Sequence, residues 1–484
     1  MISVTTTRMP GCRYPKTKDY SPKECYPEYQ FGSSCLSRAN DVYGLVRKCL
    51  ADHGCDSENF GKSNWNPLGK WIQKGQRVFV LTNFVMHRRP WESYERFLAK
   101  CTHGSVIRPV LDYACIATGD PGLVCFGNAP LQSCEYEKVL QETGADSISR
   151  FYRDRAGVEV GPHDLRLLKS RWTNFGAQVD VRKESLGHAV TIDLGRASFL
   201  EELFVGRGEV QVRVGDYCPS DTMSYHDKGK HVYVINRKIL ESDVIISIPK
   251  LKTHQKVGIT CALKGTVGSI GRKECLAHHR IGSSEAAGDE YPFKGMWRDY
   301  SSYMSDKACY MGTDISSNVY RVASKILSRI MRMGPRGITY GAWYGNDTAW
   351  RMTLDIARIM RFGRIDGTMD EAPARNHLSF VDGIVAGEGE GPMAPIPRKL
   401  GVLLFSPDIC AADLACARIM GFDPSKIKLI ENSFRCDTYP ITEEKKEDII
   451  FTVNGKNIEQ NEMKEFFRPT FKPPKGWVGV IEDK

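Results

Sequence analysis

The sequence has no long hydrophobic run. No stretch approaches the roughly 18 consecutive apolar residues that a membrane-spanning helix requires, so we expect no transmembrane segment. Residues 1–20, MISVTTTRMPGCRYPKTKDY, contain no apolar core of the kind that a signal peptide carries. These two absences predict a cytoplasmic protein.

Paired-cysteine motifs are absent as well. The 16 cysteines are scattered and none forms a CxxC pair, so the usual signatures of zinc ribbons and iron–sulfur clusters are missing. Most of them, such as Cys261 and Cys416, lie in apolar segments, and we expect buried thiols in a reducing compartment. Four cysteines lie close together in the N-terminal segment, and a local metal or redox site remains an alternative for them: Cys25, Cys35, Cys49 and Cys55.

Motifs of three common enzyme classes are missing too. The chain has no Walker A sequence and no GxSxG elbow, and the glycines of 387–391 do not open a helix as a dinucleotide-binding motif would. No internal repeat or low-complexity tract occurs. Of the 484 residues, 41% are hydrophobic and 26% are charged, which is typical of a globular protein. This length allows about three structural units or one large α/β domain with insertions.

Strand and helix patterns along the chain predict an α/β fold. Short apolar runs at 77–85, 122–130 and 242–249 are typical of buried strands, and later apolar runs cover 378–387, 401–408 and 426–433. Helices are expected at 41–53, 105–117, 322–333, 348–362 and 411–422. We therefore expect a mostly parallel open sheet with flanking helices, a Cys- and Pro-rich N-terminal arm and a helical insertion. We expect the chain to divide into an N-terminal arm at 1–75, an α/β core at 76–294 and 371–438, a helical insertion at 295–370 and a C-terminal tail at 439–484.

Positive charge is concentrated in one segment. Residues 226–280 contain eleven Lys and Arg, four acidic residues and five of the 11 His, which accounts for +7 of the total charge of +9. The rest of the chain is nearly neutral, and the segment lacks interleaved aromatic residues, which disfavours nucleic-acid binding. The pattern predicts a site for a small anion.

The centre of this segment, SDVIISIPKLKTHQKVGITCALKGTVGSIGRKECLAHHR, has the features of such a site. A strand that ends at Pro249 leads into a loop at the carboxyl end of the sheet, where open α/β folds bind ligands. Lys250, Lys252 and His254 alternate there, so an extended backbone would point all three to one side. Four glycines would let backbone amides approach a phosphate or carboxylate: Gly258, Gly265, Gly268 and Gly271. A basic surface loop with glycine turns is the alternative.

A second group of polar residues follows at His278 and His279. Because adjacent side chains diverge, we expect one histidine to be a ligand or proton shuttle and the other to pack. Arg280, Asp289 and Glu290 follow shortly after them.

Two other motifs are expected to have mainly structural positions, at the end of a strand and at the start of a helix. The stretch 380–392 predicts Asp382 at a strand end and Glu388 in a glycine-rich loop. Asn346, Asp347 and Thr348 precede a helix, and we expect Asp347 or Thr348 to cap it.

These motifs resemble the bacterial and archaeal family known as domain of unknown function 362, in particular its long-form members from surface-polysaccharide or specialised-metabolite gene clusters. The resemblance covers nearly the whole chain, in blocks that include NWNPLGKWIQKG, SDVIISIPKLKTH, HHRIGSSEAAGDEYP, GNDTAWRMTLD and VDGIVAGEGEGP. The sequence departs from the family pattern at Leu81, Asn128 and Gly265. These departures imply either a different substrate or a partly lost site.

A more remote similarity is to the N-terminal region of nickel-pincer lactate racemases. The matching residues here are His254, Lys264 and either His278 or His279. In that family, such residues serve proton transfer, cofactor attachment and metal ligation.

Together, the residues and the resemblance predict a biosynthetic enzyme that acts on a small anionic metabolite by isomerase- or epimerase-like proton transfer. The candidate catalytic residues are His254, Lys264, His278 and His279. The candidate substrate-binding residues are Lys250, Lys252, Asn83, His103, Arg280, Arg351 and Glu388. The candidate metal ligands are His254, His279, Asp289 and Glu290, with the cofactor unknown and a divalent metal and an oligomer left open. The alternative is a non-catalytic anion-binding or scaffolding protein.

Overall fold

The computed structural model describes residues 2–32, 36–37, 40–173, 176–181, 187–205, 210–215, 217–310, 315–333, 338, 340–435 and 438–483. Cys35 of the N-terminal cysteine group lies outside these residues.

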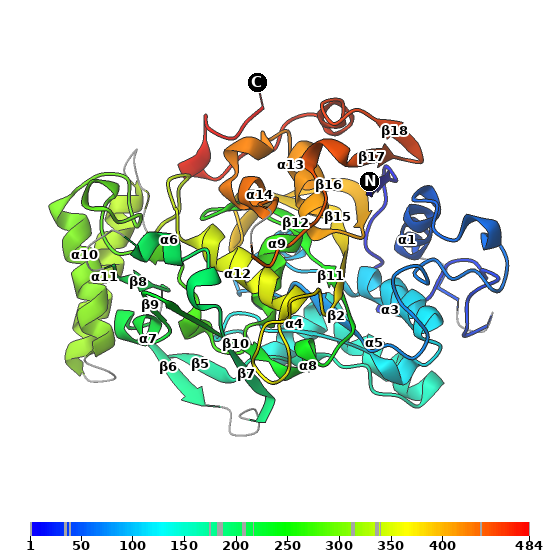
Figure 1. The fold of residues 1–484 in the computed structure, drawn as a ribbon, viewed down its shortest axis with the longest axis horizontal. Helices are drawn as coiled ribbons and strands as arrows, with labels where there is room; N and C mark the ends of the chain where they lie inside the picture. Colours follow the sequence, from blue (N-terminus) through cyan, green and yellow to red (C-terminus); the bar gives the residue numbers. More distant parts are fainter. Residues whose placement is uncertain are drawn as a thin grey trace.

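A large mixed sheet forms the centre of the molecule (Figure 1). Its strands lie in the order β18-β17-β1-β16-β15-β11-β2-β3-β4, with β12 and β13 attached beside β15. Their bounds are β1 Ser3–Arg8, β2 Val78–Thr82, β3 Val124–Asn128, β4 His163–Asp164, β11 Val244–Ile248, β12 Lys250–His254, β13 Gly258–Thr260, β15 Asn376–Glu390, β16 Ala394–Ser406, β17 Ile450–Val453 and β18 Lys456–Ile458. From β15 to β4 the neighbouring strands all run parallel.

Helices cover both faces of this sheet (Figure 1). Their bounds are α1 Asp41–Asp52, α2 Tyr94–Leu98, α3 Gly104–Thr118, α4 Tyr136–Thr143, α5 Ala145–Ala156, α6 Glu201–Phe204, α7 Pro219–Met223, α8 Arg237–Leu240, α9 Ala262–Gly265, α10 Met296–Tyr310, α11 Ile315–Met333, α12 Ala349–Phe362, α13 Ile409–Met420 and α14 Lys428–Ser433. Three small sheets complete the fold: β7 Ala189–Asp193 with β10 Lys230–Asn236 and β9 His226–Asp227; β8 Val212–Arg213 with β14 His279–Arg280; and β5 Leu168–Thr173 with β6 Gly176–Val181.

The central strands are buried on both faces. In β2, Val78 and Val80 pack in the cluster formed with α1 and α3, while Phe79 and Leu81 pack in the cluster formed with α12. Successive side chains of a strand point to opposite faces, so a run of apolar residues without polar alternation suits a strand that has helices on both sides. This confirms the predicted α/β class with a large, mostly parallel open sheet.

Two expectations about the loops are wrong. The segment after Pro249 is not a loop but strand β12, which pairs antiparallel with β13 and parallel with β15. The glycine-rich segment around Glu388 is also not a loop, because β15 continues through it to Glu390 and pairs with β16. Consequently, Asp382 lies within a strand rather than at its end.

Both chain termini belong to the main sheet. Strand β1 of the predicted arm lies between β16 and β17, and β17 comes from the predicted tail. By contrast, α10 and α11 stand together at one edge of the molecule, away from the sheet (Figure 1). Within the described part of the chain, no helix combines the length and the apolar character that crossing a bilayer requires.

Candidate functional site

The basic residues of β12 are held inside the protein. Lys250 Nζ lies 2.6 Å from Asp382 Oδ2 on the neighbouring strand, and both side chains are fully buried. The hydroxyl of Tyr14 donates to the other oxygen, Oδ1, of Asp382 at 2.6 Å, and His103 stacks on the Tyr14 ring at 4.2 Å. Lys250 and His103 were expected to bind substrate, but their partners make them part of the packing between β12, β15 and the N-terminal segment.

Lys252 points to a different neighbourhood. Its Nζ donates to Asn83 Oδ1 at 2.6 Å and to the carbonyl of Lys100 at 2.5 Å. Burial lowers the Lys252 pKa from 10.5 to about 7. The structure therefore joins two of the predicted substrate-binding residues, Lys252 and Asn83, directly.

Lys264 lies just beyond β13, in the short helix α9. Asp413 of α13 holds the start of this helix by accepting the backbone N–H of Ala262 at 2.6 Å. Lys264 is 8% exposed, and within the described part of the chain its ammonium group makes no hydrogen bond or ion pair. Burial, followed by the charge of Lys256, lowers the Lys264 pKa from 10.5 to about 7.

Two further lysines, Lys256 and Lys273, lie close enough to Lys264 for their charges to interact with it. Burial lowers the pKa of Lys273 to about 7, and its Nζ donates to the carbonyls of Ala129 and Val267 at 2.9 and 3.1 Å. Burial also lowers the pKa of Lys256 to about 8. Neither residue was singled out from the sequence, although both lie in the basic segment, which was the available signal.

His254 and His278 are the histidines of this cluster. Burial and the nearby Lys264 charge hold the pKa of both well below 6.5, so both rings are neutral. His254 Nδ1 accepts the Lys256 backbone N–H at 3.1 Å, whereas His278 Nδ1 donates to the Leu276 carbonyl at 3.1 Å. These contacts leave Nε2 protonated in His254 and unprotonated in His278, so one ring can donate a proton where the other can accept one.

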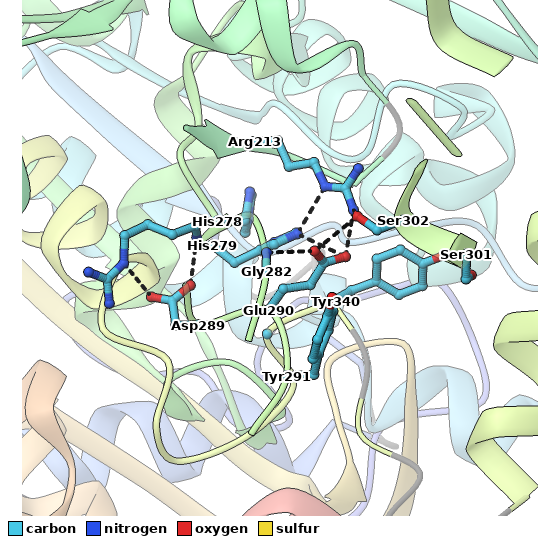
Figure 2. A network of polar contacts seen from close by, with 12 residues as sticks. Arg213, His278, His279, Gly282, Asp289, Glu290, Tyr291, Ser301, Ser302 and Tyr340 are labelled. Carbon is cyan, nitrogen blue, oxygen red and sulfur yellow. Dashed lines mark hydrogen bonds and ion pairs between the residues drawn. The ribbon is translucent and has the colours of Figure 1, made fainter. Parts of the chain in front are cut away.

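His279 lies at the edge of that cluster, with its Nδ1 3.5 Å from Lys256 Nζ. Figure 2 shows its ring beside a buried ion pair in which Arg213 Nη2 lies 2.5 Å from Glu290 Oε1. Arg213 Nε donates to His279 Nε2 at 3.3 Å, and burial keeps the His279 pKa well below 6.5. The expected divergence of the two adjacent histidines is thus observed, and His279 belongs to the Arg213 network.

Asp289 and Arg280 form a third neighbourhood. Asp289 accepts the Arg280 backbone N–H at 2.5 Å and the Thr348 hydroxyl at 2.6 Å. Thr348, one of the two expected caps, is the N-cap residue of α12, but its side chain makes no capping hydrogen bond. Asn346 Oδ1 supplies that contact instead, by accepting the N–H groups of Thr348 and Ala349 at 3.1 and 2.9 Å.

The four predicted metal ligands therefore contact three different sets of residues. His254 joins Lys264, His279 and Glu290 join Arg213, and Asp289 joins Arg280. Among the described residues, no group of three or more His, Cys, Asp or Glu side chains is placed to hold a metal ion. This donor set does not fit the divalent metal that the sequence left open.

Two predicted substrate-binding residues lie apart from the Lys264 cluster. Arg351 of α12 donates to the Asp347 carbonyl at 2.9 Å and pairs with Glu202, and Glu388 pairs with Arg398 at 3.2 Å. Surface cavities of about 450 and 530 Å³ also lie elsewhere, beside α1 and beside α6.

The glycines provide close packing rather than a nest of free amides. The N–H groups of Gly265 and Gly271 already donate, at 2.9 Å each, to the carbonyls of Cys261 and Val234. A Cβ on Gly268 would lie 2.2 Å from Asn128 Nδ2. The expectation that these amides cradle an anion is therefore wrong at Gly265 and Gly271.

The cysteines behave in part as expected. Cys261 and Cys416 are fully buried, and burial raises the pKa of both thiols. Of the N-terminal group, Cys49 and Cys55 are buried and Cys25 is exposed.

Comparison with known proteins finds a family model that is similar to the centre of this chain. Residues 199–418 match the model of the domain of unknown function DUF362. The matched part contains Lys250, Lys252, Lys264 and both histidines of the cluster.

Two individual proteins show weaker similarity. The thylakoid-associated protein sll1697 of Synechocystis sp. is 32% identical over 134 residues, which cover 28% of this chain and 41% of that protein. A crystal structure of a Thermotoga maritima protein, a structural genomics target, aligns with 80% of this chain and 59% of its own at 15% identity and a TM-score of 0.31. That TM-score is too low to establish a shared fold.

Proposed function

We propose that the protein is a biosynthetic enzyme that binds a small phosphate- or carboxylate-bearing metabolite at the Lys264 cluster and catalyses proton transfer at carbon, as an isomerase or epimerase does. We define the Lys264 cluster as Lys252, Lys256, Lys264, Lys273, His254 and His278. The observation that carries this proposal is the cationic group itself: within the described residues, none of its four lysines forms an ion pair with a carboxylate.

An anion would supply the missing counter-charge. Burying an ammonium group without a partner is costly, and the protein avoids part of this cost because the pKa of Lys252, Lys264 and Lys273 falls to about 7. A bound anion raises these pKa values again, since opposite charge favours the protonated form. We therefore expect anion binding to take up protons near neutral pH and to weaken as the pH rises above about 7.

The two histidines support the catalytic part of the proposal. His254 Nε2 carries a proton and His278 Nε2 does not, and both rings are neutral beside Lys264. In a proton transfer at carbon, His278 would remove the proton, His254 would return one, and Lys264 would stabilise the negative charge that develops on the substrate. His278 is the partly exposed member of this trio, which makes it the side from which substrate would approach.

The test separates binding from catalysis. Binding of inorganic phosphate is measured by calorimetry in two buffers of different ionisation enthalpy, which reports proton uptake. Lys264→Met should weaken binding at least about tenfold, as expected for loss of a charge-assisted contact. The matched control Lys426→Met removes an exposed lysine and should leave binding unchanged.

Catalysis is measured as exchange of substrate C–H for deuterium in heavy water, with a panel of phosphorylated and carboxylated metabolites. His254→Gln and His278→Gln should abolish exchange while phosphate binding persists. If phosphate binds but no metabolite exchanges, the alternative of a non-catalytic anion-binding or scaffolding protein is correct. If phosphate does not bind the wild-type protein, the proposed site is refuted.

A further inference from the structure

Lys264 depends on helix α9 for its position. Its ammonium group makes no hydrogen bond or ion pair among the described residues, so no contact of its own fixes where it lies. Helix α9 is a single turn, Ala262–Gly265, which closes where the Gly265 N–H donates to the Cys261 carbonyl at 2.9 Å. The contacts that hold α9 in place therefore also determine where Lys264 lies.

The start of α9 has no cap of its own. The N-cap residue is Cys261, and its thiol makes no capping hydrogen bond. The first N–H groups of a helix have no partner within the helix, and leaving them unpaired in the interior costs free energy. Ala262 and Leu263 carry two of these groups and are fully buried. A partner from elsewhere in the fold is therefore required.

Asp413 of α13 is that partner. Its Oδ1 accepts the N–H group of Ala262 at 2.6 Å and that of Leu263 at 3.3 Å. Three positions later, on the same face of α13, the thiol of Cys416 forms a hydrogen bond with that of Cys261. Helix α13 lies next to α9 (Figure 1) and packs on the main sheet. Asp413 thereby ties the single turn of α9 to a helix of 12 residues.

The second oxygen of Asp413 indicates that the group is uncharged. Asp413 is fully buried, and its Oδ2 makes no hydrogen bond among the described residues. An ionised carboxylate with such an oxygen is costly to bury, and burial raises the pKa of Asp413 to about 8. A protonated carboxyl group still accepts hydrogen bonds at Oδ1. It also brings no negative charge to α9 that would compete with a bound anion for Lys264.

We propose that Asp413 is a positioning residue for Lys264, which it holds in the anion site by accepting the first N–H groups of α9 as an uncharged group. This inference deepens the proposed function and rests on it, because Lys264 is the group proposed there to bind the anion. Without this acceptor, α9 would turn until its N–H groups meet water or another acceptor, and Lys264 would move with it. An ammonium group that moves toward water regains hydration, so the Lys264 pKa would rise from about 7 toward 10.5.

The first experiment follows the Lys264 pKa by NMR titration of the full-length protein with isotope-labelled lysine side chains. The Lys264 signal is the one that is missing in Lys264→Met. Asp413→Leu removes the acceptor at a similar side-chain volume and should raise the proton affinity of Lys264 at least about tenfold. Asp413→Asn keeps an uncharged acceptor oxygen and should leave this affinity within about twofold of the wild-type value. The matched control Asp355→Leu removes another fully buried carboxyl group that accepts a backbone N–H, from Phe199 at 2.8 Å, and should leave it unchanged.

The second experiment measures binding of inorganic phosphate by calorimetry. Asp413→Leu should bind phosphate at least about tenfold more weakly than the wild type, whereas Asp413→Asn should bind it equally well. Should Asp413→Leu not fold, Asp413→Ala takes its place, because it removes the acceptor and leaves room for water at the N–H groups.

Two results would overturn the inference. An unchanged Lys264 pKa in a folded variant without the acceptor would show that Asp413 serves stability alone. A pKa that rises as far in Asp413→Asn as in Asp413→Leu would show that the charge of Asp413, and not its acceptor oxygen, sets the Lys264 environment. If phosphate does not bind the wild-type protein, the proposed function is refuted, and the titration still decides whether Asp413 positions Lys264. If phosphate binds the wild type and Asp413→Leu equally well, the proposed function stands and this inference is wrong.

Discussion

Replacing Lys264 by methionine tests whether its ammonium group is folded into the protein without a counter-charge. Methionine has a similar length and no charge, so it can occupy the same space without the cost of desolvation. In the folded protein the Lys264 pKa is about 7, against 10.5 in the unfolded chain. At about 1.4 kcal/mol for each tenfold change in proton affinity, this difference corresponds to at most ~5 kcal/mol.

The sign of the pH dependence follows from these two values. Below about pH 7 both states hold the proton, and folding bears the whole cost of burying the charge. Between about pH 7 and 10.5 the unfolded chain holds more protons than the folded protein, so this group's unfavourable contribution shrinks as the pH rises. Lys264→Met should therefore be more stable than the wild type at about pH 6. The difference between their free energies of unfolding should shrink by ~1.4 kcal/mol per pH unit above pH 7.

The assay is urea denaturation followed by tryptophan fluorescence, for both proteins, from about pH 6 to 9.5. A difference in packing between methionine and lysine does not change with pH. The test is therefore how the difference in the free energy of unfolding changes with pH, and not how large that difference is. Lys426→Met, at an exposed position, should differ from the wild type by less than ~0.5 kcal/mol at every pH. A difference for Lys264→Met that stays constant over this range would refute the reasoning.

Three other replacements test the buried polar contacts. Asp382→Asn leaves Lys250 buried without its 2.6 Å partner and should lower the free energy of unfolding by about 3–5 kcal/mol, measured by urea denaturation; an effect below ~1 kcal/mol would contradict this pairing. Arg213→Met breaks the pair with Glu290 and should expose helices α10 and α11 to limited proteolysis before the rest of the protein, with cleavage elsewhere first as the contrary outcome. Asn346→Ala removes the cap of α12 and should lower the thermal stability by about 2 kcal/mol, while an unchanged melting temperature would contradict that role.

Local patterns in the sequence were sufficient for the main elements. The runs VFVLT and VIISI become β2 and β11, and the amphipathic stretches become α1, α3 and α12. Whether a strand or helix is buried on one face or on both decides which of its positions are apolar. These positions lie within a few residues of each other, so the hydrophobic pattern can be recognised locally in the sequence. The segment after Pro249 was predicted as a loop; it is a strand that pairs with β13 a few residues on and with β15, which lies more than a hundred positions away.

The roles of the candidate residues depended on distant partners. The sequence located the basic segment 226–280, and with it Lys252, Lys264 and His254. It could not show that Lys250 is paired with Asp382, because that contact joins residues 132 positions apart.

The sequence by itself determined the α/β class, the central strands and several of the longer helices, and the segment in which positive charge and histidine collect. Only the tertiary structure decided which of those groups have partners. Lys250 is neutralised by a carboxylate from another strand, whereas Lys264 has no such partner among the described residues. His278 and His279, adjacent in the chain, enter different networks. The physical reason is that secondary structure depends on neighbours in sequence, while the charge state of a buried group depends on which atoms the fold brings within a few ångströms of it.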